Sequence, residues 1–438
     1  MTWTTLTLEV TTPLFNGGAS SGLAQEEEAG VRVASIRGVM RFWFRAMAGA
    51  MTGTDLRLLA ALERRVFGGI GSGDAVRSSP LILRIPAPPH ASRSIDLPRD
   101  GSDAAPIGYL MGLGLMKPAG GIPALERPCV ASGTPFDLKI RFRHDVTATA
   151  EVGEAVEALA FVSLWLACTY GGFGARTRRG FGGVRIVNVA GDLPVSWRPE
   201  WLRTPGLGFY ANAKPWPWPP AVFGIYERYL PELIKAESGK AAGPLDSWAG
   251  EPLFPVLSRK YSPVVLSPER FGTWQKALAY AGRQLRLFRA NRPTGQVGRQ
   301  SGAVKTAEWD EVVYGDDDRF TLGALGLPVG YRDKAKKYGF VVNAASPAGG
   351  EMEELRRASP LWLRAVGSGQ SWGLLTFAFR SSFLPDAAQV RIVPDKKARQ
   401  AGERTKTLYV EQEDVDSLTG QWLATLADGG NFTTTVRE

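Results

Sequence analysis

Residues 170–183 read YGGFGARTRRGFGG and combine three features suited to binding a polyanion. Glycines without a Cβ let backbone N–H groups approach a phosphodiester closely, and the stretch supplies Gly172, Gly174 and Gly180. Guanidinium forks pair bidentately with phosphate, and the stretch supplies Arg176, Arg178 and Arg179. Aromatic rings stack on bases, for which the stretch offers Phe173 and Phe181. The stretch therefore predicts a nucleic-acid contact; the alternative is a flexible surface loop whose phenylalanines enter the core.

The glycine pattern does not fit a nucleotide cofactor. A P-loop needs a lysine after its glycines, and neither this stretch nor GGIGSGDAV (68–76) has one. A dinucleotide fingerprint leads from a strand into a helix, whereas residues 170–183 lead from an apolar helix into a strand. RGFGGVRI (179–186) resembles the RNP1 pattern of RNA-recognition motifs but enters the last strand instead of the third, so we interpret it as a coincidence of composition. We predict no cofactor.

Candidates for catalysis and for metal binding are few. His90 and His144 are the two histidines, and no second base or lysine is spaced to assist either one as a general acid or base. Three consecutive aspartates (316–318) predict a turn, because a two-metal site takes its carboxylates from separate elements. We therefore predict no catalytic residue and no metal site.

The elements that position the loop follow a recognisable order. Alternating apolar residues predict strands, and 3.6-residue periodicity predicts helices. In the first half the expected elements are a strand at 4–10, helices at 35–51 and 55–67, strands at 79–85 and 134–144, a helix at 151–170 and a strand at 182–189. Apart from the extra helix, this is the split βαβ order of a ferredoxin-like domain. A long insertion is expected at 86–133.

The second half is expected to repeat the element order of the first. Strands are expected at 252–258, 359–366, 372–383 and 431–437, and helices at 271–290 and 413–428. The string SPLILR (79–84) recurs as SPLWLR (359–364), which favours duplication. We predict an α+β fold of two ferredoxin-like (RRM-like, βαββαβ) domains in tandem with long insertions: 1–195, a Pro/Trp-rich linker or insertion at 196–250 that includes KPWPWPP (214–220), and 251–438.

A second basic feature lies on the helix SIRGVMRFWFRAMAGAM (35–51), which Ser35 could cap. Its apolar positions share one face: Met40, Phe44, Met47 and Met51. Its arginines recur every four residues on the adjacent arc: Arg37, Arg41 and Arg45. Because both helices of a ferredoxin-like domain pack on one side of the sheet, we expect this stripe and the glycine loop to share a rim.

The composition is that of a globular protein, with 438 residues, 44% hydrophobic and 22% charged. The net charge of +9 favours polyanionic partners. Cys129 and Cys168 match no zinc spacing. Cys168 ends an apolar run, which predicts a buried free thiol, and a reducing compartment fits this cysteine usage. The N-terminus has no basic signal region, and the longest apolar run (158–168) is too short to cross a bilayer. We therefore expect a cytoplasmic protein without membrane contact.

Several segments resemble the RAMP superfamily of CRISPR-associated proteins, and more narrowly the first subunits of type III-B Cmr effector complexes. They are TPLFNGGA (12–19), SIRGVMRFWFRAMAG (35–49), RRVFGG…SSPLILR (64–84), YGGFGARTRRGFGG (170–183), LGALGLPVGYR (322–332) and RRASPLWLR (356–364). The resemblance implies a non-catalytic subunit at the end of a ribonucleoprotein filament. Its implied partners are the CRISPR guide RNA near its 3′ region, the paired target RNA and other Cmr subunits.

Carried over by residue, the resemblance implies that Arg37 and Gly38, with Arg41 and Arg45, hold RNA backbone, as do the glycines and arginines of the loop. Target sequence would be read by base pairing, and the protein would read shape and phosphate.

Two other functions stay open. Some relatives are metal-independent endoribonucleases that process CRISPR RNA with histidine, and His90 or His144 would then be the candidate. The other alternative is a protein scaffold without RNA contact, for which several tryptophans in loops are suited: Trp197, Trp201, Trp216 and Trp218. Two further basic segments, KKARQAGERTK (396–406) and the helix that carries Arg283, Arg286 and Arg289, are interpreted as solvated faces.

Overall fold

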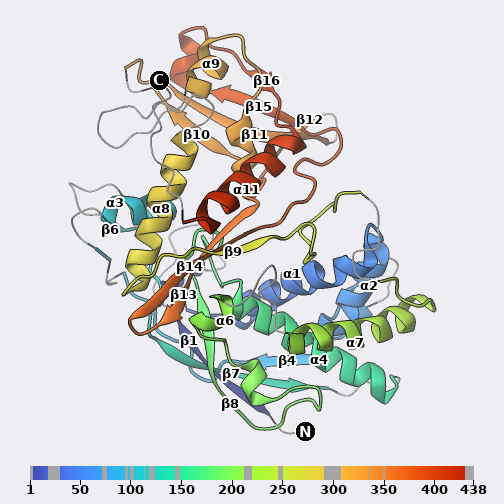
Figure 1. The fold of residues 1–438 in the computed structure, drawn as a ribbon. Helices are drawn as coiled ribbons and strands as arrows, with labels where there is room; N and C mark the ends of the chain where they lie inside the picture. Colours follow the sequence, from blue (N-terminus) through green and yellow to red (C-terminus); the bar gives the residue numbers. More distant parts are fainter. Residues whose placement is uncertain are drawn as a thin grey trace.

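A computed structural model gives the fold of the chain. It describes residues 3–17, 30–71, 76–93, 97–98, 103–112, 114–117, 124–143, 148–211, 220–244, 250–290, 307–333, 335–348 and 351–429. Figure 1 shows the first-half sheet at one end of the molecule and a second-half sheet at the other, with helices between and beside them.

The first half is built on a four-stranded antiparallel sheet. Its strands, in spatial order, are β4 (Leu81–Arg84), β7 (Pro135–Phe142), β1 (Thr4–Val10) and β8 (Val184–Ala190). Side chains of β1 alternate between buried and half-buried positions, as the apolar alternation in the sequence requires. Together with the two long helices, these strands have the order and the spatial arrangement of a split βαβ unit, as the sequence predicts for this half.

Two long helices cover one face of this sheet and pack against each other: α1 (Val33–Thr52) and α4 (Ala150–Thr169). Helix α2 (Leu56–Phe67) follows α1 and is capped by Asp55, which accepts a hydrogen bond from the N–H of Leu58. Ser35 does not cap α1, because its hydroxyl donates to Asn16 and the N-cap position is Arg32. Helix α4 is long and apolar enough to cross a membrane, but 83% of its most apolar window is buried inside the protein.

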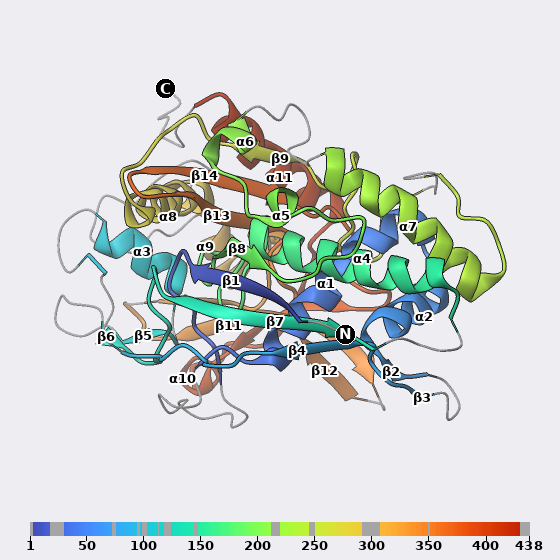
Figure 2. The same ribbon diagram turned by 90° about the horizontal axis from the view of Figure 1, so that it is seen from below.

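The segment expected as a linker contains helices. They are α5 (Pro199–Leu202), α6 (Leu207–Ala211) and the 19-residue α7 (Pro220–Ser238). Helix α7 lies beside α4 and α2 (Figure 2). Trp197 is buried and donates to the carbonyl of Ala158, so it belongs to the core and not to a protein interface; Trp216 and Trp218 lie outside the described residues.

The expected insertion at 86–133 is a bridge to the second half. It contains α3 (Ala104–Met111) and the short strands β5 (Met116–Lys117) and β6 (Ala124–Leu125). Helix α3 packs against α8 (Trp274–Ala290), and Ile107, Leu110 and Met111 join the core around α8. A further short hairpin, β2 (Gly69–Ile70) with β3 (Val76–Arg77), precedes β4.

The second half contains a three-stranded antiparallel sheet whose strands are β13 (Leu361–Ser368), β14 (Ser371–Ala378) and β9 (Val264–Leu266), in this order. The prediction of a strand at 252–258 is wrong, because the strand that pairs with β14 lies at 264–266. The helices expected at 271–290 and 413–428 are α8 and α11 (Gln412–Ala427). The strand expected at 431–437 lies outside the described residues. The two SPLxLR strands each occupy a sheet edge: β4 lies beside β7, and β13 lies beside β14.

A separate five-stranded sheet, which the sequence does not predict, lies between β9 and α11 along the chain. Its strands are β10 (Val329–Arg332), β11 (Gly339–Ala348), β15 (Gln389–Pro394) and β16 (Lys406–Leu408), with β12 (Glu351–Leu355) paired to β11. The short helices α9 (Ala307–Tyr314), η2 (Thr321–Leu325) and α10 (Lys396–Gln400) flank it.

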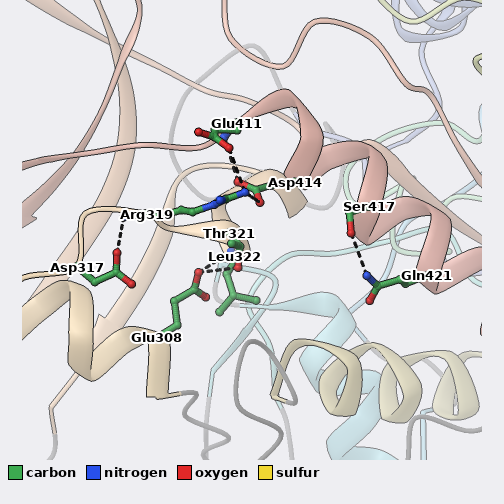
Figure 3. A network of polar contacts seen from close by, with 9 residues as sticks. All are labelled: Glu308, Asp317, Arg319, Thr321, Leu322, Glu411, Asp414, Ser417 and Gln421. Carbon is green, nitrogen blue, oxygen red and sulfur yellow. Dashed lines mark hydrogen bonds and ion pairs between the residues drawn. The ribbon is translucent and has the colours of Figure 1, made fainter.

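Polar contacts tie α9, η2 and α11 together (Figure 3). Buried Glu308 accepts from the hydroxyl of Thr321 and the N–H of Leu322, while Arg319 pairs with Asp414 of α11 at 2.9 Å. The three aspartates at 316–318 form the expected turn, in which Asp317 accepts from the N–H of Arg319. Both cysteines are buried free thiols.

Candidate nucleic-acid interface

The glycine loop at 170–183 lies at the seam between the two halves. The N–H of Leu363 donates to the carbonyl of Arg178 at 3.1 Å, and Arg179 forms a parallel bridge with Leu363. The loop therefore extends the free edge of β13. On its other side, Ala175 and Gly182 donate to the carbonyls of Phe15 and Pro13. Thus the loop joins the first-half sheet to the second-half sheet.

Neighbouring protein atoms fill the space beside the loop glycines, where side chains would otherwise lie. A Cβ on Gly172 would lie 2.8 Å from the carbonyl oxygen of Gly182, and one on Gly180 would collide with Leu278 of α8. Gly174 and Gly180 have φ values of +87° and +90°. The prediction that Gly172 and Gly180 open the backbone to a phosphodiester is therefore wrong, since their missing side chains make room for neighbouring residues.

The loop phenylalanines do not present a stacking surface. Phe173 is 1% exposed and belongs to the core of the first half, and Phe181 is 1% exposed and belongs to the core around α8. Phe181 packs edge-on against Phe15 with ring centroids 5.8 Å apart. Base stacking by Phe173 and Phe181 is thus a wrong prediction, and these rings instead fix the two ends of the loop in different cores.

The three loop arginines have different surroundings. Arg178 donates to the carbonyl of Ser359 and lies over the ring of Trp362, 5.1 Å from its centroid. Burial, with Arg357 nearby, lowers the pKa of Arg178 to about 10. Arg178 is therefore a seam contact. Arg176 is exposed at a left-handed φ of +62°, and Arg179 is partly exposed.

Arg176 and Arg179 form a rim with residues from two other elements. Burial, together with the charges of Arg289 on α8 and of Arg176, lowers the pKa of Arg179 to about 10. The guanidinium of Arg176 approaches Gly112 at the end of α3. We call Arg176, Arg179 and Arg289 the seam rim. Within the described residues, no carboxylate lies within 4 Å of the guanidinium groups of Arg179 and Arg289.

Neighbouring cations that lower the pKa of Arg179 make this cluster electrostatically costly in the free protein. Arg179 remains charged at neutral pH, because a pKa of about 10 is still well above 7. An anion placed between them would remove the repulsion, and guanidinium groups favour phosphate. The sequence singled out Arg176 and Arg179 for this chemistry but missed the contribution of Arg289, which lies 110 positions farther along the chain.

The arginine stripe of α1 does not meet the loop. Arg41 and Arg45 both pair with Glu63 of α2, at 2.7 and 2.9 Å. Arg41 also donates to the carbonyls of Phe67 and Gly68. The loop contacts the opposite face of α1, where Trp43 packs on Tyr170, and Trp43 is two residues or about 200° around the helix from Arg41. The expectation of a rim shared by stripe and loop is therefore wrong.

The N-terminal part of α1 keeps an open surface. Arg37 donates to the carbonyl of Leu81, and burial together with Arg41 lowers its pKa. Gly38 is exposed in the helix, and a Cβ built on it meets no atom within 4 Å. Glycine in a helix interior costs up to about 1 kcal/mol relative to alanine. Nothing in the described structure needs this glycine, which is consistent with close approach of an outside molecule.

A buried arginine that the sequence reasoning missed fastens the seam. Arg364 of β13 is 5% exposed and donates to three first-half carbonyls, those of Cys168, Gly171 and Val184. These include carbonyls at the C-terminal end of α4, where a cation is favoured. The sequence signal for Arg364 is its place at the end of the recurring string SPLWLR. That signal does not identify the carbonyls it binds, because they lie more than 170 positions away along the chain.

The candidates for other chemistry stay apart. His90 is exposed, and His144 lies outside the described residues. The described residues contain no group of three or more His, Cys, Asp or Glu side chains that could hold a metal ion.

Comparison with known proteins supports the resemblance to the RAMP superfamily. Residues 7–185 match the model of the RAMP superfamily, which confirms the resemblance seen in the sequence. Over 365 residues the chain is 24% identical to the CRISPR system Cmr subunit Cmr1-1 of Pyrococcus furiosus, covering 83% of this chain and 84% of that protein. It is 28% identical to Cmr1-2 of the same organism over 194 residues, 41% of this chain and 92% of that protein.

Solved structures that contain a similar chain include the crystal structure of apo Cmr1 from Pyrococcus furiosus. It has 20% identity and a TM-score of 0.49, covering 94% of this chain and 99% of that one. A chain in the cryo-EM structure of a type III-B Cmr-beta complex bound to cognate target RNA has 12% identity and a TM-score of 0.46, covering 97% of this chain and 99% of that one.

Proposed function

Because residues 7–185 of this chain are a RAMP superfamily match, we propose that the chain is a non-catalytic, RNA-contacting subunit of a type III-B CRISPR (Cmr) ribonucleoprotein complex. The relatives' names support the subunit assignment, since two Cmr subunits match the chain in sequence. The partners are then the CRISPR guide RNA, the target RNA and other Cmr subunits, in the cytoplasm. Both halves, 1–195 and 251–438, are interpreted as ferredoxin-like units joined by 196–250.

The observation that carries the RNA contact is the seam rim. Arg176, Arg179 and Arg289 converge from the loop and from α8. Within the part of the chain that the structure describes, neither Arg179 nor Arg289 forms an ion pair with a carboxylate. A phosphodiester is the anion that such a group fits in a CRISPR complex. Arg37 and Gly38 form a second point of backbone contact on α1, while Arg41 and Arg45 act mainly by holding α1 against α2.

The test is the salt dependence of RNA binding by the variant with Arg179→Ala and Arg289→Ala together. Each phosphate contact on a single strand contributes roughly 0.7 to the slope of log K against log salt, so the slope should fall by about 1.4. Lys276→Ala is the matched control, because Lys276 is an exposed cation in the first turn of the same helix α8. An unchanged slope in the double variant would remove the rim from the RNA site.

The non-catalytic assignment has its own test. Labelled RNA incubated with the purified chain, with and without a divalent metal, should yield no cleavage product. A product that disappears in His90→Ala or His144→Ala would instead support the endoribonuclease alternative.

A further inference from the structure

The strands of the five-stranded sheet bring several basic segments to one end. β10 ends at Arg332 opposite Gly339, where β11 begins, and β15 ends at Pro394 opposite Phe340. β16 begins at Lys406, opposite Ile392. The turn at 335–336, which precedes β11, and the segment at 395–405 therefore emerge side by side. The N–H of Asp395 donates to the carbonyl of Gly339 at 2.7 Å, which holds the two segments together.

We call this region the basic sheet end, and it displays seven exposed cations: Arg332, Lys336, Lys337, Lys396, Lys397, Arg399 and Arg404. The described residues at 332–338 and 395–405 contain three carboxylates, Asp333, Asp395 and Glu403. Among the described residues, none of the seven cations has a carboxylate within ion-pair distance. The surface therefore carries an excess of positive charge that the protein itself does not neutralise.

Two of the three carboxylates already accept hydrogen bonds from backbone N–H groups. Asp333 is buried and accepts from the N–H groups of Ala335 and Lys336, and from the hydroxyl of Tyr314 at 2.8 Å. Asp395 accepts from the N–H of Ala398 at the start of α10, and this hydrogen bond lowers its pKa. Both shape the segments that carry the lysines.

The placement of the lysines does not serve folding. Lys396 is the first residue of α10, at the end of a helix that disfavours cations. Lys337 has a φ of +59°, a left-handed conformation that favours glycine and costs about 1 kcal/mol or more for other residues. Residues kept in unfavourable positions on a surface point to a functional contact.

One lysine is held in place. The ammonium of Lys336 lies 3.6 Å from the centroid of the Tyr314 ring, and the Tyr314 hydroxyl is fixed by Asp333. This cation–π contact orders a side chain that would otherwise be flexible, so less entropy is lost when it binds a ligand.

We propose that the basic sheet end is a second nucleic-acid surface, which binds the phosphodiester backbone of single-stranded RNA. Lysine is depleted from the cores of protein interfaces, whereas spread lysine and arginine side chains suit a phosphate chain. Figure 1 places β10, β15 and β16 at the opposite end of the molecule from β1, β7 and β8. The surface stands on its own observations and does not require the seam rim to bind RNA.

The test compares two full-length variants by fluorescence anisotropy with a labelled single-stranded RNA over a range of salt concentrations. The first variant combines Lys336→Gln, Lys337→Gln, Lys396→Gln and Lys397→Gln. If all four side chains contact phosphates, its slope of log K against log salt should fall by about 2.8. The control removes four exposed cations elsewhere, with Arg203→Gln, Arg228→Gln, Lys235→Gln and Lys240→Gln, and should change the slope much less.

The proposal is overturned if the slope is unchanged in the first variant, or if the slope falls equally in the control. It is also overturned if the first variant loses binding to polyglutamate but still binds RNA, which would indicate an acidic protein partner. A parallel arm with single-stranded DNA of the same sequence distinguishes RNA from any phosphodiester strand. Adding Arg179→Ala and Arg289→Ala to the first variant should lower the slope further. The contribution of the basic sheet end and that of the seam rim to RNA binding are therefore measured separately.

A single substitution separates function from folding at this surface. Lys337→Gly removes a charge and also relieves the left-handed strain, so it should raise stability and weaken RNA binding at low salt about twofold or more. If the lysine had a structural role, the same change would lower the unfolding midpoint in urea. Weaker binding with equal or higher stability supports the proposal, and unchanged binding contradicts it.

Discussion

Gly38→Ala offers a sharp test of whether an outside molecule approaches α1. Gly38 lies in the sixth position of a 20-residue helix, is exposed, and has no atom within 4 Å of the position that a Cβ would take. Alanine can therefore be added without a clash. The change removes the entropic cost of glycine in a helix, so the free energy of unfolding should rise by about 0.5–1 kcal/mol.

The same methyl group would lie between the helix backbone and a bound phosphate. Loss of one close contact worth about 1 kcal/mol corresponds to roughly fivefold weaker RNA binding. The assays are urea unfolding of the free chain and anisotropy with labelled RNA. Stability and affinity should thus move in opposite directions, a pattern that a general folding defect cannot produce.

Gly224→Ala provides the matched control, since Gly224 is also exposed in a helix, α7, with no atom within 4 Å of its Cβ position. It should stabilise the chain similarly and leave RNA binding unchanged. If Gly38→Ala stabilises the chain and RNA binds as before, the reasoning that the glycine is kept for an outside ligand is refuted.

Three further predictions concern the fold. Burial raises the pKa of Glu308 from 4.5 to about 7, and the charge of Asp414 adds to the rise. The folded chain therefore binds a proton at Glu308 more tightly than the unfolded chain does. As a result, the free energy of unfolding should fall by on the order of 3 kcal/mol as pH rises from about 4.5 through 7. Urea unfolding of Glu308→Gln should lack this pH dependence, and an equal slope in both proteins would contradict the assignment. Arg364→Met leaves three buried carbonyls without their donor and should cost about 3 kcal/mol in urea unfolding; a loss below about 1 kcal/mol would show that the seam does not depend on it. Gly180→Ala combines a φ of +90° with a collision against Leu278 and should cost about 2–4 kcal/mol, while an unchanged midpoint would mean that the seam opens easily.

Local patterns in the sequence determined the elements of the first half. Alternation in TTLTLEV produced β1, and the apolar run near residue 160 produced α4, within one or two residues of the expected ends. The second half was less well predicted. The short strand β9 has a weak pattern, and the five-stranded sheet depends on pairings between segments such as 339–348 and 389–394 that have no local signal.

The composition of residues 170–183 showed that the loop was special but not what it contacts. A glycine makes room equally well for a phosphate or for a neighbouring side chain, and a guanidinium pairs equally well with phosphate or with a carbonyl. Only the tertiary structure decided between these uses, because the partners Leu278, Ser359 and Leu363 are about 100 to 190 positions away along the chain. It buried both phenylalanines and turned Arg178 inward. It also placed Arg289 beside Arg179, since the packing of α3 and α8 fixes which cations share a surface.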